Sequence, residues 1–227
     1  MKMKQIAIDG PAGAGKSTIA KEVSKRLGFV YVDTGAMYRT LALACIENGT
    51  DTQDEAAAAA CCSAADIDIR YENGVQQMYL SGRCVSRDIR REDVGTAASH
   101  VARYSGVRSR LVALQQELGS RYDVVMDGRD IGTTVLPDAD LKIYLTASVQ
   151  CRAERRFKEL GDRNVPCDIE KIKKDIESRD LNDMTREISP LRQAEDAIVV
   201  DTSDMDIDQV TGRIMELFET VSREEAE

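Results

Sequence analysis

Short apolar runs recur along the chain and are separated by longer amphipathic stretches. The runs occupy residues 5–9, 29–32, 124–126, 141–145 and 197–200. Each is nearly continuous and ends at, or is followed by, Asp or Thr, which is typical of strands buried on both faces of a parallel sheet. Helical periodicity with glycine or Asn-Gly stop signals predicts helices over residues 17–27, 35–47, 101–118 and 149–160. This alternation predicts a doubly wound α/β fold, with a five-stranded parallel sheet flanked by helices.

Two segments do not follow this alternation of strands and helices. Residues 66–86 alternate apolar and polar positions around Asn73-Gly74, a strong signal for a hairpin turn. We therefore expect a small antiparallel β insertion, over residues 63–98. A second interruption, at residues 162–168, separates two charged helices and is a candidate mobile cover. The length fits one domain, residues 1–227, that carries both features.

Composition narrows the classes of function. The net charge of −9 argues against a protein that binds duplex nucleic acid through bulk electrostatics. No apolar stretch approaches the roughly 18–20 residues of a membrane-spanning helix, and the N-terminus lacks the apolar core of a signal peptide. The six cysteines have no metal-binding spacing, and His100 is the only histidine. We therefore expect a cytoplasmic protein with reduced cysteines and no nucleic-acid or membrane partner, and nothing in the sequence requires more than a monomer.

The segment GPAGAGKST, residues 10–18, directly follows the first apolar run and fits the G-x-x-x-x-G-K-[ST] pattern. Its glycines allow successive backbone N–H groups to face a phosphate, and the helix that follows adds its positive end. Lys16 can reach the β- and γ-phosphates, and the Ser17 hydroxyl can bind Mg²⁺. The segment therefore predicts a site for ATP and Mg²⁺. The residues expected to bind ATP are Gly10, Pro11, Ala12, Gly13, Ala14, Gly15, Lys16, Ser17 and Thr18.

Several kinds of protein share this loop, and the rest of the chain reduces the choice. The guanine-reading N-K-x-D motif is absent from the sequence, and the negative charge disfavours a nucleic-acid translocase. A kinase that phosphorylates a small acceptor remains. Two other hypotheses stay open: a kinase of AMP, shikimate or gluconate, and a nucleotide-gated binding protein.

Candidate acceptor-binding residues follow two further strands. Asp33-Thr34-Gly35 is a helix N-cap and first turn at the carboxyl end of the second strand, and Tyr38 and Arg39 lie one turn later. Asp127, Arg129 and Asp130 follow the third strand at the same expected edge of the sheet. Of these groups, Arg39 could hold a phosphate of the acceptor, and Tyr38 could pack on the acceptor or hydrogen-bond to it.

Two sets of charged residues with helical spacing come later in the chain. Arg152, Arg155 and Arg156 are spaced i, i+3, i+4, so their guanidinium groups would share one helix face and favour a phosphate partner. Arg179, Asp183 and Arg186 are spaced i, i+4, i+7 and would share a face if the helix persists.

The segments IDGPAGAGKST, DTGAMYR, TAAS, DGRDIGT and RDLNDMTREISPL, in this order, closely resemble the bacterial cytidylate kinases, which belong to the nucleoside monophosphate kinases. The resemblance extends from the first strand to about Thr202. It implies that the insertion binds the nucleoside monophosphate, that residues 152–168 form a lid over ATP, and that the γ-phosphoryl group of ATP passes to CMP or dCMP.

The resemblance also implies roles for single residues. The implied ligands of the acceptor phosphate are Thr34, Arg39, Arg129 and Arg186. Arg179 and Asp183 are the implied sugar contacts, and Tyr38 is an implied wall of the pocket. The implied base readers are Ser99, Arg108 and Asp130. The residues implied in catalysis are Lys16, Arg129, Arg152, Arg156 and Arg186. Cytosine suits this set, because a carboxylate can accept from its exocyclic amine while an arginine donates to its N3 and O2.

Overall fold

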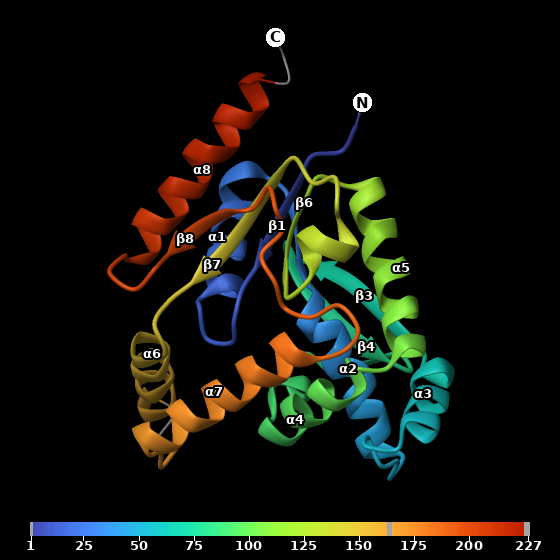
Figure 1. Cartoon of the computed structure of the whole chain (residues 1–227). Coiled ribbons are helices and arrows are strands. Elements are labelled where there is room, and N and C mark those ends of the chain that lie inside the picture. Colours follow the sequence, from blue (N-terminus) through green and yellow to red (C-terminus); the bar gives the residue numbers. More distant parts are fainter. Residues whose placement is uncertain (1, 163–164, 225–227) are drawn as a thin grey trace. The chain divides into compact units, whose positions relative to one another are not determined.

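The computed structural model describes residues 2–162 and 165–224 (Figure 1). The chain divides into two compact units, which we call the first and second unit. The first unit comprises Met1–Phe29 and Asp123–Glu227, and the second comprises Val30–Tyr122. The second unit contains the expected insertion, residues 63–98. Of the expected lid, residues 163 and 164 lie outside the described residues.

The five apolar runs form the predicted parallel sheet, with the strand order β2-β6-β1-β7-β8. The strands are β1 (Gln5–Asp9), β2 (Val30–Asp33), β6 (Val124–Gly128), β7 (Leu141–Thr146) and β8 (Ile198–Asp201). Within the first unit, Ile8 lies opposite Asp127 of β6 and Ile143 of β7. Because these strands are parallel, the residues that follow them meet at one edge of the sheet.

Two pairs of helices complete the first unit. Helices α1 (Lys16–Leu27) and α8 (Ile207–Glu224) pack against each other and against strands of the sheet. Helices α6 (Val149–Asp162) and α7 (Ile169–Thr185) pack together around Ala153, Ile172 and Ile176 (Figure 1). The predicted stop at Gly161 is wrong, because α6 continues through this glycine, which costs a helix only about 1 kcal/mol. A one-turn π-helix, η2 (Ile131–Val135), follows β6.

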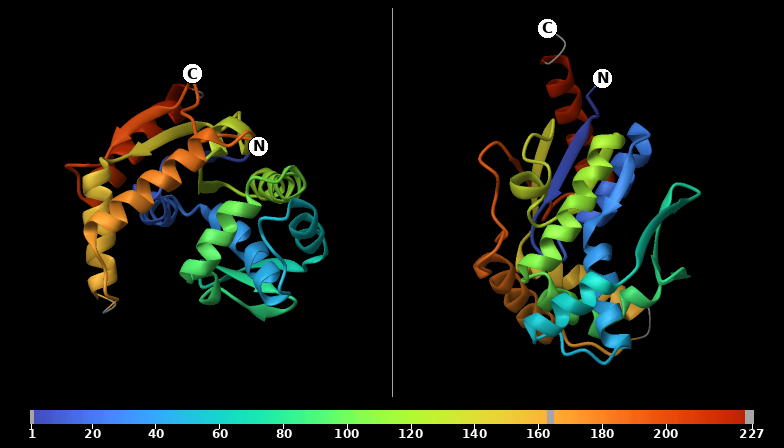
Figure 2. Two further views of the ribbon diagram at one scale, coloured as in Figure 1. Left: turned by 60° about the horizontal axis from the view of Figure 1, so that its bottom comes forward. Right: turned by 90° about the vertical axis from the view of Figure 1, so that its right-hand side faces the viewer.

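The second unit combines helices with a three-stranded antiparallel sheet of order β3-β4-β5. Its remaining elements are α2 (Thr34–Glu47), α3 (Glu55–Ala64), β3 (Ile67–Glu72), β4 (Val75–Leu80), β5 (Arg83–Cys84), η1 (Asp88–Arg90), α4 (Glu92–Val101) and α5 (Ser105–Arg121). The predicted hairpin of β3 and β4 is confirmed (Figure 2). Asn73 and Gly74 connect the two strands with φ of 52° and 76°, the left-handed values that such a turn requires.

The helix predicted over residues 101–118 is confirmed from Ser105 onward, but its predicted start at residue 101 is wrong. The chain instead turns between α4 and α5, where Tyr104 is extended, its side chain is buried, and its hydroxyl donates to the Thr52 carbonyl at 2.9 Å. Packing of this ring outweighs the local helical pattern. Gly119, predicted as a stop, is buried inside α5, which ends at Arg121.

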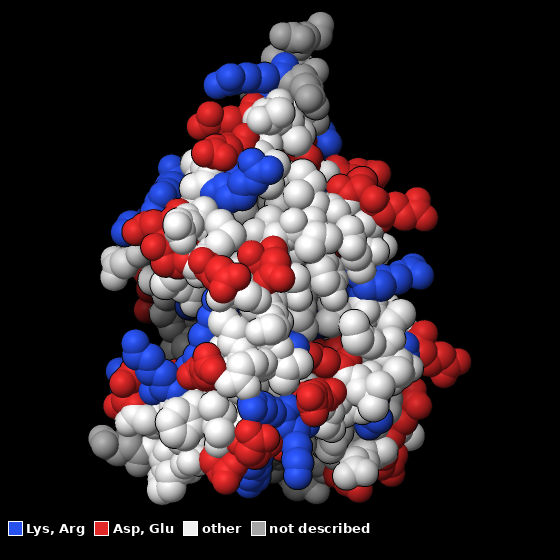
Figure 3. Space-filling view, turned by 60° about the vertical axis from the view of Figure 1, so that its left-hand side comes forward, with Lys and Arg blue, Asp and Glu red and all other residues white. Residues whose placement is uncertain are grey.

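All six cysteines are free, and the buried Cys45 and Cys62 place their Sγ atoms 3.7 Å apart between α2 and α3. The hydrogen bond with Cys62 and burial raise the pKa of Cys45, which keeps it a thiol. On the face drawn in Figure 3, positive and negative side chains of the described residues alternate. Among residues 2–162 and 165–224, no helix has the length and apolar character needed to cross a bilayer.

Candidate functional site

The loop between β1 and α1 requires glycine at two positions at least. Gly10 has a φ of 149°, and a Cβ atom there would lie 1.9 Å from the backbone oxygen of Leu145 in β7. Gly15 has a φ of 90° and forms the N-cap of α1. The loop is therefore held close to the sheet, with the N-terminus of α1 at its end. This geometry is the one that binds phosphate groups in P-loop proteins.

Lys16 is buried beneath this loop, with 5% of its surface exposed. Its Nζ donates to the carbonyl of Pro11 at 2.7 Å. Burial, and then the nearby positive charge of Arg129, lower the pKa of Lys16 to about 7. Two cations close together repel each other, and a polyanion would relieve this repulsion.

Two carboxylates support the loop from the ends of β1 and β6. The Ser17 hydroxyl donates to Asp127 Oδ2 at 2.8 Å. Asp9 accepts the backbone N–H groups of Ile131 and Gly132, each at 2.8 Å, and so fixes the start of η2. Burial raises the pKa of Asp9 to about 6, although these hydrogen bonds oppose the shift. Sequence analysis did not identify Asp9 as a site residue, because the two N–H groups that it binds lie more than a hundred residues later in the chain.

The arginines after β6 and α7 form ion pairs with two other predicted site residues, Asp183 and Asp130. Arg129 Nε donates to Asp183 Oδ2 at 2.7 Å, and Arg186 pairs with Asp130 at 3.4 Å. The side chains of Arg186 and Asp130 are only 6% and 8% exposed. The expectation that Arg186 shares a helix face with Arg179 and Asp183 is wrong, because α7 ends at Thr185 and Arg186 is extended. Arg179 is exposed on α7.

The three arginines of α6 reach different partners within the described structure. Arg152 is buried, and it donates to the carbonyl of Ala12 at 2.8 Å and pairs with Asp180 at 2.7 Å. Arg155 bonds to Thr202, and the exposed Arg156 pairs with Glu159 in its own helix. Their different depths explain the difference, since spacing predicts a common side of a helix but not the partner that each side chain reaches. Arg152 therefore holds the P-loop backbone in this structure.

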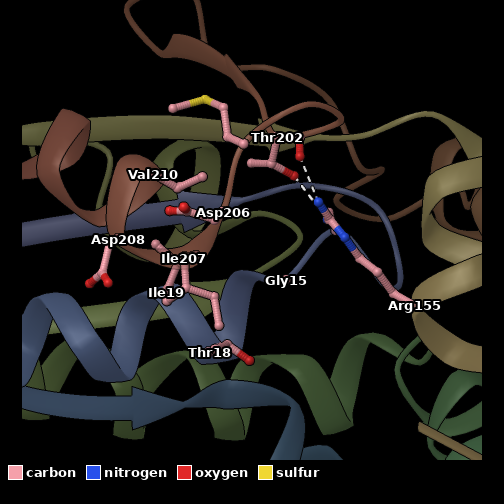
Figure 4. A pocket seen from close by; sticks show the side chains of 11 residues that line it. Gly15, Thr18, Ile19, Arg155, Thr202, Asp206, Ile207, Asp208 and Val210 are labelled. Atoms are coloured by element: carbon pink, nitrogen blue, oxygen red, sulfur yellow. Dashed lines mark hydrogen bonds between the residues drawn. The ribbon is translucent and has the colours of Figure 1, made fainter. Parts of the chain in front are cut away.

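A cavity of about 520 Å³ adjoins the P-loop in the first unit. Arg155 forms one wall, with its guanidinium group bonded to the hydroxyl and carbonyl oxygens of Thr202 at 3.0 and 2.6 Å (Figure 4). The lining residues are Ala14, Gly15, Thr18, Ile19, Arg155, Thr202, Met205, Asp206, Ile207, Asp208 and Val210. Sequence analysis missed the wall after β8, although residues after a parallel strand often line a site.

The candidate acceptor residues of the second unit lie on and around α2. Asp33 caps this helix by accepting the N–H of Ala36 at 2.8 Å, as predicted, and Thr34 is buried in its first turn. Arg39 pairs with Asp33 at 3.1 Å, while its buried Nε has no hydrogen-bond partner in the described structure.

Both candidate base readers of the second unit, Arg108 and Ser99, contact other residues of that unit. The buried Arg108 places its guanidinium carbon 5.7 Å from the centre of the Tyr38 ring, so these two residues lie together. Ser99 Oγ donates to the Gly95 carbonyl of its own helix at 3.3 Å.

A glycine-rich loop and a buried lysine after the first strand of a parallel sheet define a P-loop nucleotide-binding protein. A family profile described as cytidylate kinase matches residues 6–220, and the chain belongs to this family. The chain is 50% identical to the cytidylate kinase of Pediococcus pentosaceus, covering 96% of this chain and 97% of that protein. It is 47% identical to the enzyme of Caldicellulosiruptor bescii, covering 99% and 100% of the two chains.

A more distant likeness concerns the fold alone. The shikimate kinase from Bacteroides thetaiotaomicron superposes with a TM-score of 0.50 at 12% identity, covering 96% of this chain and 99% of that chain. At this identity, the likeness indicates a P-loop kinase fold and says nothing about the acceptor.

Proposed function

We propose that the protein transfers the γ-phosphoryl group of ATP to CMP or dCMP and forms ADP with CDP or dCDP. The observation that carries this proposal is the buried Lys16 beneath the P-loop, with the half-buried Arg129 near enough to lower its pKa. A buried lysine close to a second cation is suited to hold two phosphate chains together. Family membership identifies the acceptor as cytidylate.

The chemistry needs positioning and charge stabilisation more than proton transfer. The acceptor phosphate is already anionic near neutral pH, so no residue has to act as a general base. Lys16, Arg129 and Arg186 would offset the repulsion between the two substrates and stabilise charge on the transferring group. Arg152 would act through the P-loop, because it binds the Ala12 carbonyl, and the exposed Arg156 would approach ATP when the lid, residues 152–168, excludes water.

The donor set at Ser17 and Asp127 fits Mg²⁺. A hydroxyl and a carboxylate oxygen lie 2.8 Å apart beside the P-loop, and Mg²⁺ prefers oxygen ligands of this kind. We propose that these residues hold Mg²⁺ together with the phosphates of ATP. The ion would supply positive charge against the β- and γ-phosphates.

We assign the phosphate, the sugar and the base of the acceptor to different sets of residues. We assign its phosphate to Thr34, Arg39, Arg129 and Arg186, and the unpartnered Nε of Arg39 supports this assignment for the second unit. We assign the sugar to Arg179 and Asp183. The base is assigned to Ser99, Arg108 and Asp130, with Tyr38 against Arg108 as a wall.

The nucleobase of ATP suits the cavity beside the P-loop. This cavity adjoins Gly15 and Thr18, and apolar side chains such as Ile19 and Val210 line it. The guanidinium plane of Arg155 offers a surface for stacking. Arg155→Met should therefore raise the KM for ATP about tenfold and leave the KM for CMP nearly unchanged.

Arg213→Met is the matched control for the Arg155 variant, because Arg213 is exposed on α8, pairs with Glu216 of its own helix and does not line the cavity. Steady-state kinetics with each substrate varied in turn measure both constants. An unchanged KM for ATP in the Arg155 variant would contradict the assignment of the nucleobase to this cavity.

The acceptor is tested by measuring ADP release with a panel of small molecules. Purified protein with ATP and Mg²⁺ should phosphorylate CMP and dCMP, while AMP, shikimate and gluconate should give rates at least about a hundredfold lower, because they lack the groups that the base readers recognise. Equal rates with AMP or shikimate would contradict the proposed function. ATP binding with negligible turnover of every acceptor would favour a nucleotide-gated binding protein.

A further inference from the structure

Asp33 is a carboxylate shared by two arginines of the second unit. Its side chain is only 7% exposed. Arg39, one and a half turns along α2, reaches both of its oxygens at 3.2 and 3.1 Å through one terminal nitrogen. Arg90, which is 57 residues away at the end of η1, reaches Oδ2 at 3.1 Å. Asp33 therefore holds two guanidinium groups beside the first turn of α2.

The cluster formed by Asp33, Arg39 and Arg90 carries more positive than negative charge. Two guanidinium groups carry two positive charges, and Asp33 is the carboxylate with which each of them pairs in the described structure. The buried Nε of Arg39 also lacks a hydrogen-bond acceptor among the described residues. A surplus positive charge and an unused buried donor in one cluster both indicate that an anionic group completes it.

The backbone fixes Arg90 at this place. Its neighbour Ile89 is 1% exposed and anchors η1, and the Arg90 N–H donates to the Arg87 carbonyl at 3.0 Å. Arg91 behaves differently although its side chain is equally exposed, at 52%. It pairs with Asp93, two residues away, as an ordinary surface ion pair. The long-range contact of Arg90 is thus specific to that arginine.

We propose that Arg90 is an additional ligand of the acceptor phosphate, which it binds together with Arg39. Asp33 is the positioning residue that holds both guanidinium groups ready. Arg39 engages Asp33 through one terminal nitrogen, which leaves its Nε for a phosphate oxygen. Arg90 belongs to the insertion, so the insertion itself would contribute a charge to phosphate recognition. This inference rests on the proposed assignment of Arg39 to the acceptor phosphate.

The test compares Arg90→Met with Arg91→Met as a matched control. Arg90→Met should raise the KM for CMP about 10- to 100-fold, the effect of losing one charge-assisted hydrogen bond, and leave the KM for ATP unchanged. The inhibition constant of cytidine, which has the same base and sugar but no phosphate, should stay within about twofold. Arg91→Met should change none of these values, and Arg90→Lys should recover part of the CMP affinity.

Arg39→Met and the double variant Arg39→Met/Arg90→Met distinguish failure of the Arg90 proposal from failure of the phosphate assignment of Arg39. If Arg90 binds phosphate directly, removing it from the Arg39→Met protein raises the KM for CMP further; no further rise would show that Arg90 acts only through Arg39 and would overturn the proposal. Equal weakening of CMP and cytidine by Arg90→Met would indicate a general structural role and would also overturn it. An Arg39→Met protein with unchanged KM for CMP would refute the proposed phosphate assignment itself, independently of Arg90.

Discussion

Lys16→Met should lower kcat about 10²- to 10⁴-fold with ATP and CMP both saturating. Lys16 is the buried cation of the P-loop, and its loss removes positive charge from the place where the transferring phosphoryl group carries negative charge. Methionine fills a similar space, so the loop should keep its shape. The rate of ADP release measures the effect. Lys25→Met is the control, since Lys25 is exposed on the same helix and should leave kcat unchanged.

The same variant should be more stable than the natural protein, which separates lost catalysis from lost folding. In the folded state the pKa of Lys16 is lowered from 10.5 to about 7, mainly by burial. Between these values the unfolded chain binds more protons, so the free energy of unfolding rises with pH from about 7 to 10.5. Replacing the lysine removes its burial cost at neutral pH, and the melting temperature should rise, by about 2–4 °C for each kcal/mol.

The stability difference between Lys16→Met and the natural protein should then shrink as pH rises from about 7 toward 10.5. Thermal melts of both proteins across this range measure it. A variant that is inactive and melts at a lower temperature would instead have lost the P-loop structure, and its kinetics would say nothing about the charge of Lys16.

CMP should be preferred to UMP by about 10²- to 10⁴-fold in kcat/KM. Uracil presents an acceptor where cytosine presents its amine, and an N–H donor where cytosine presents an acceptor. Asp130 would then face an acceptor and Arg108 a donor, and each mismatch of buried groups costs about 1–3 kcal/mol. Both residues are buried, at 5% and 4% exposure, so water cannot readily repair the mismatch. Parallel assays with CMP, dCMP and UMP measure the ratio.

Asp130→Asn should reduce this preference by about tenfold or more, because the asparagine amide can donate to the uracil oxygen. Activity with CMP should also fall, since the variant loses the ion pair with Arg186. Asp138→Asn, at an exposed position of the loop before β7, is the control and should leave the ratio unchanged. If the ratio for Asp130→Asn equals that of the natural protein, Asp130 does not read the base.

Local patterns in the sequence correctly predicted most of the scaffold. The five apolar runs became the five strands, and Asn73-Gly74 became the hairpin turn. The prediction failed between α4 and α5, where a continuous helical pattern is broken by Tyr104 packing against a segment about fifty residues earlier. Such a contact leaves no periodic signal in its neighbourhood.

The sequence by itself determined the P-loop, its position after the first strand, and the residue types available for an anionic acceptor. These features depend on near neighbours, because glycine conformations, helix starts and apolar periodicity act over a few residues. Only the tertiary structure decided which partner each charged side chain reaches: Arg152 the P-loop carbonyl, Arg155 the oxygens of Thr202, and Arg90 the carboxylate of Asp33. Those partners lie tens of residues apart or more along the chain, and burial gives their contacts strength only after folding has removed water from them.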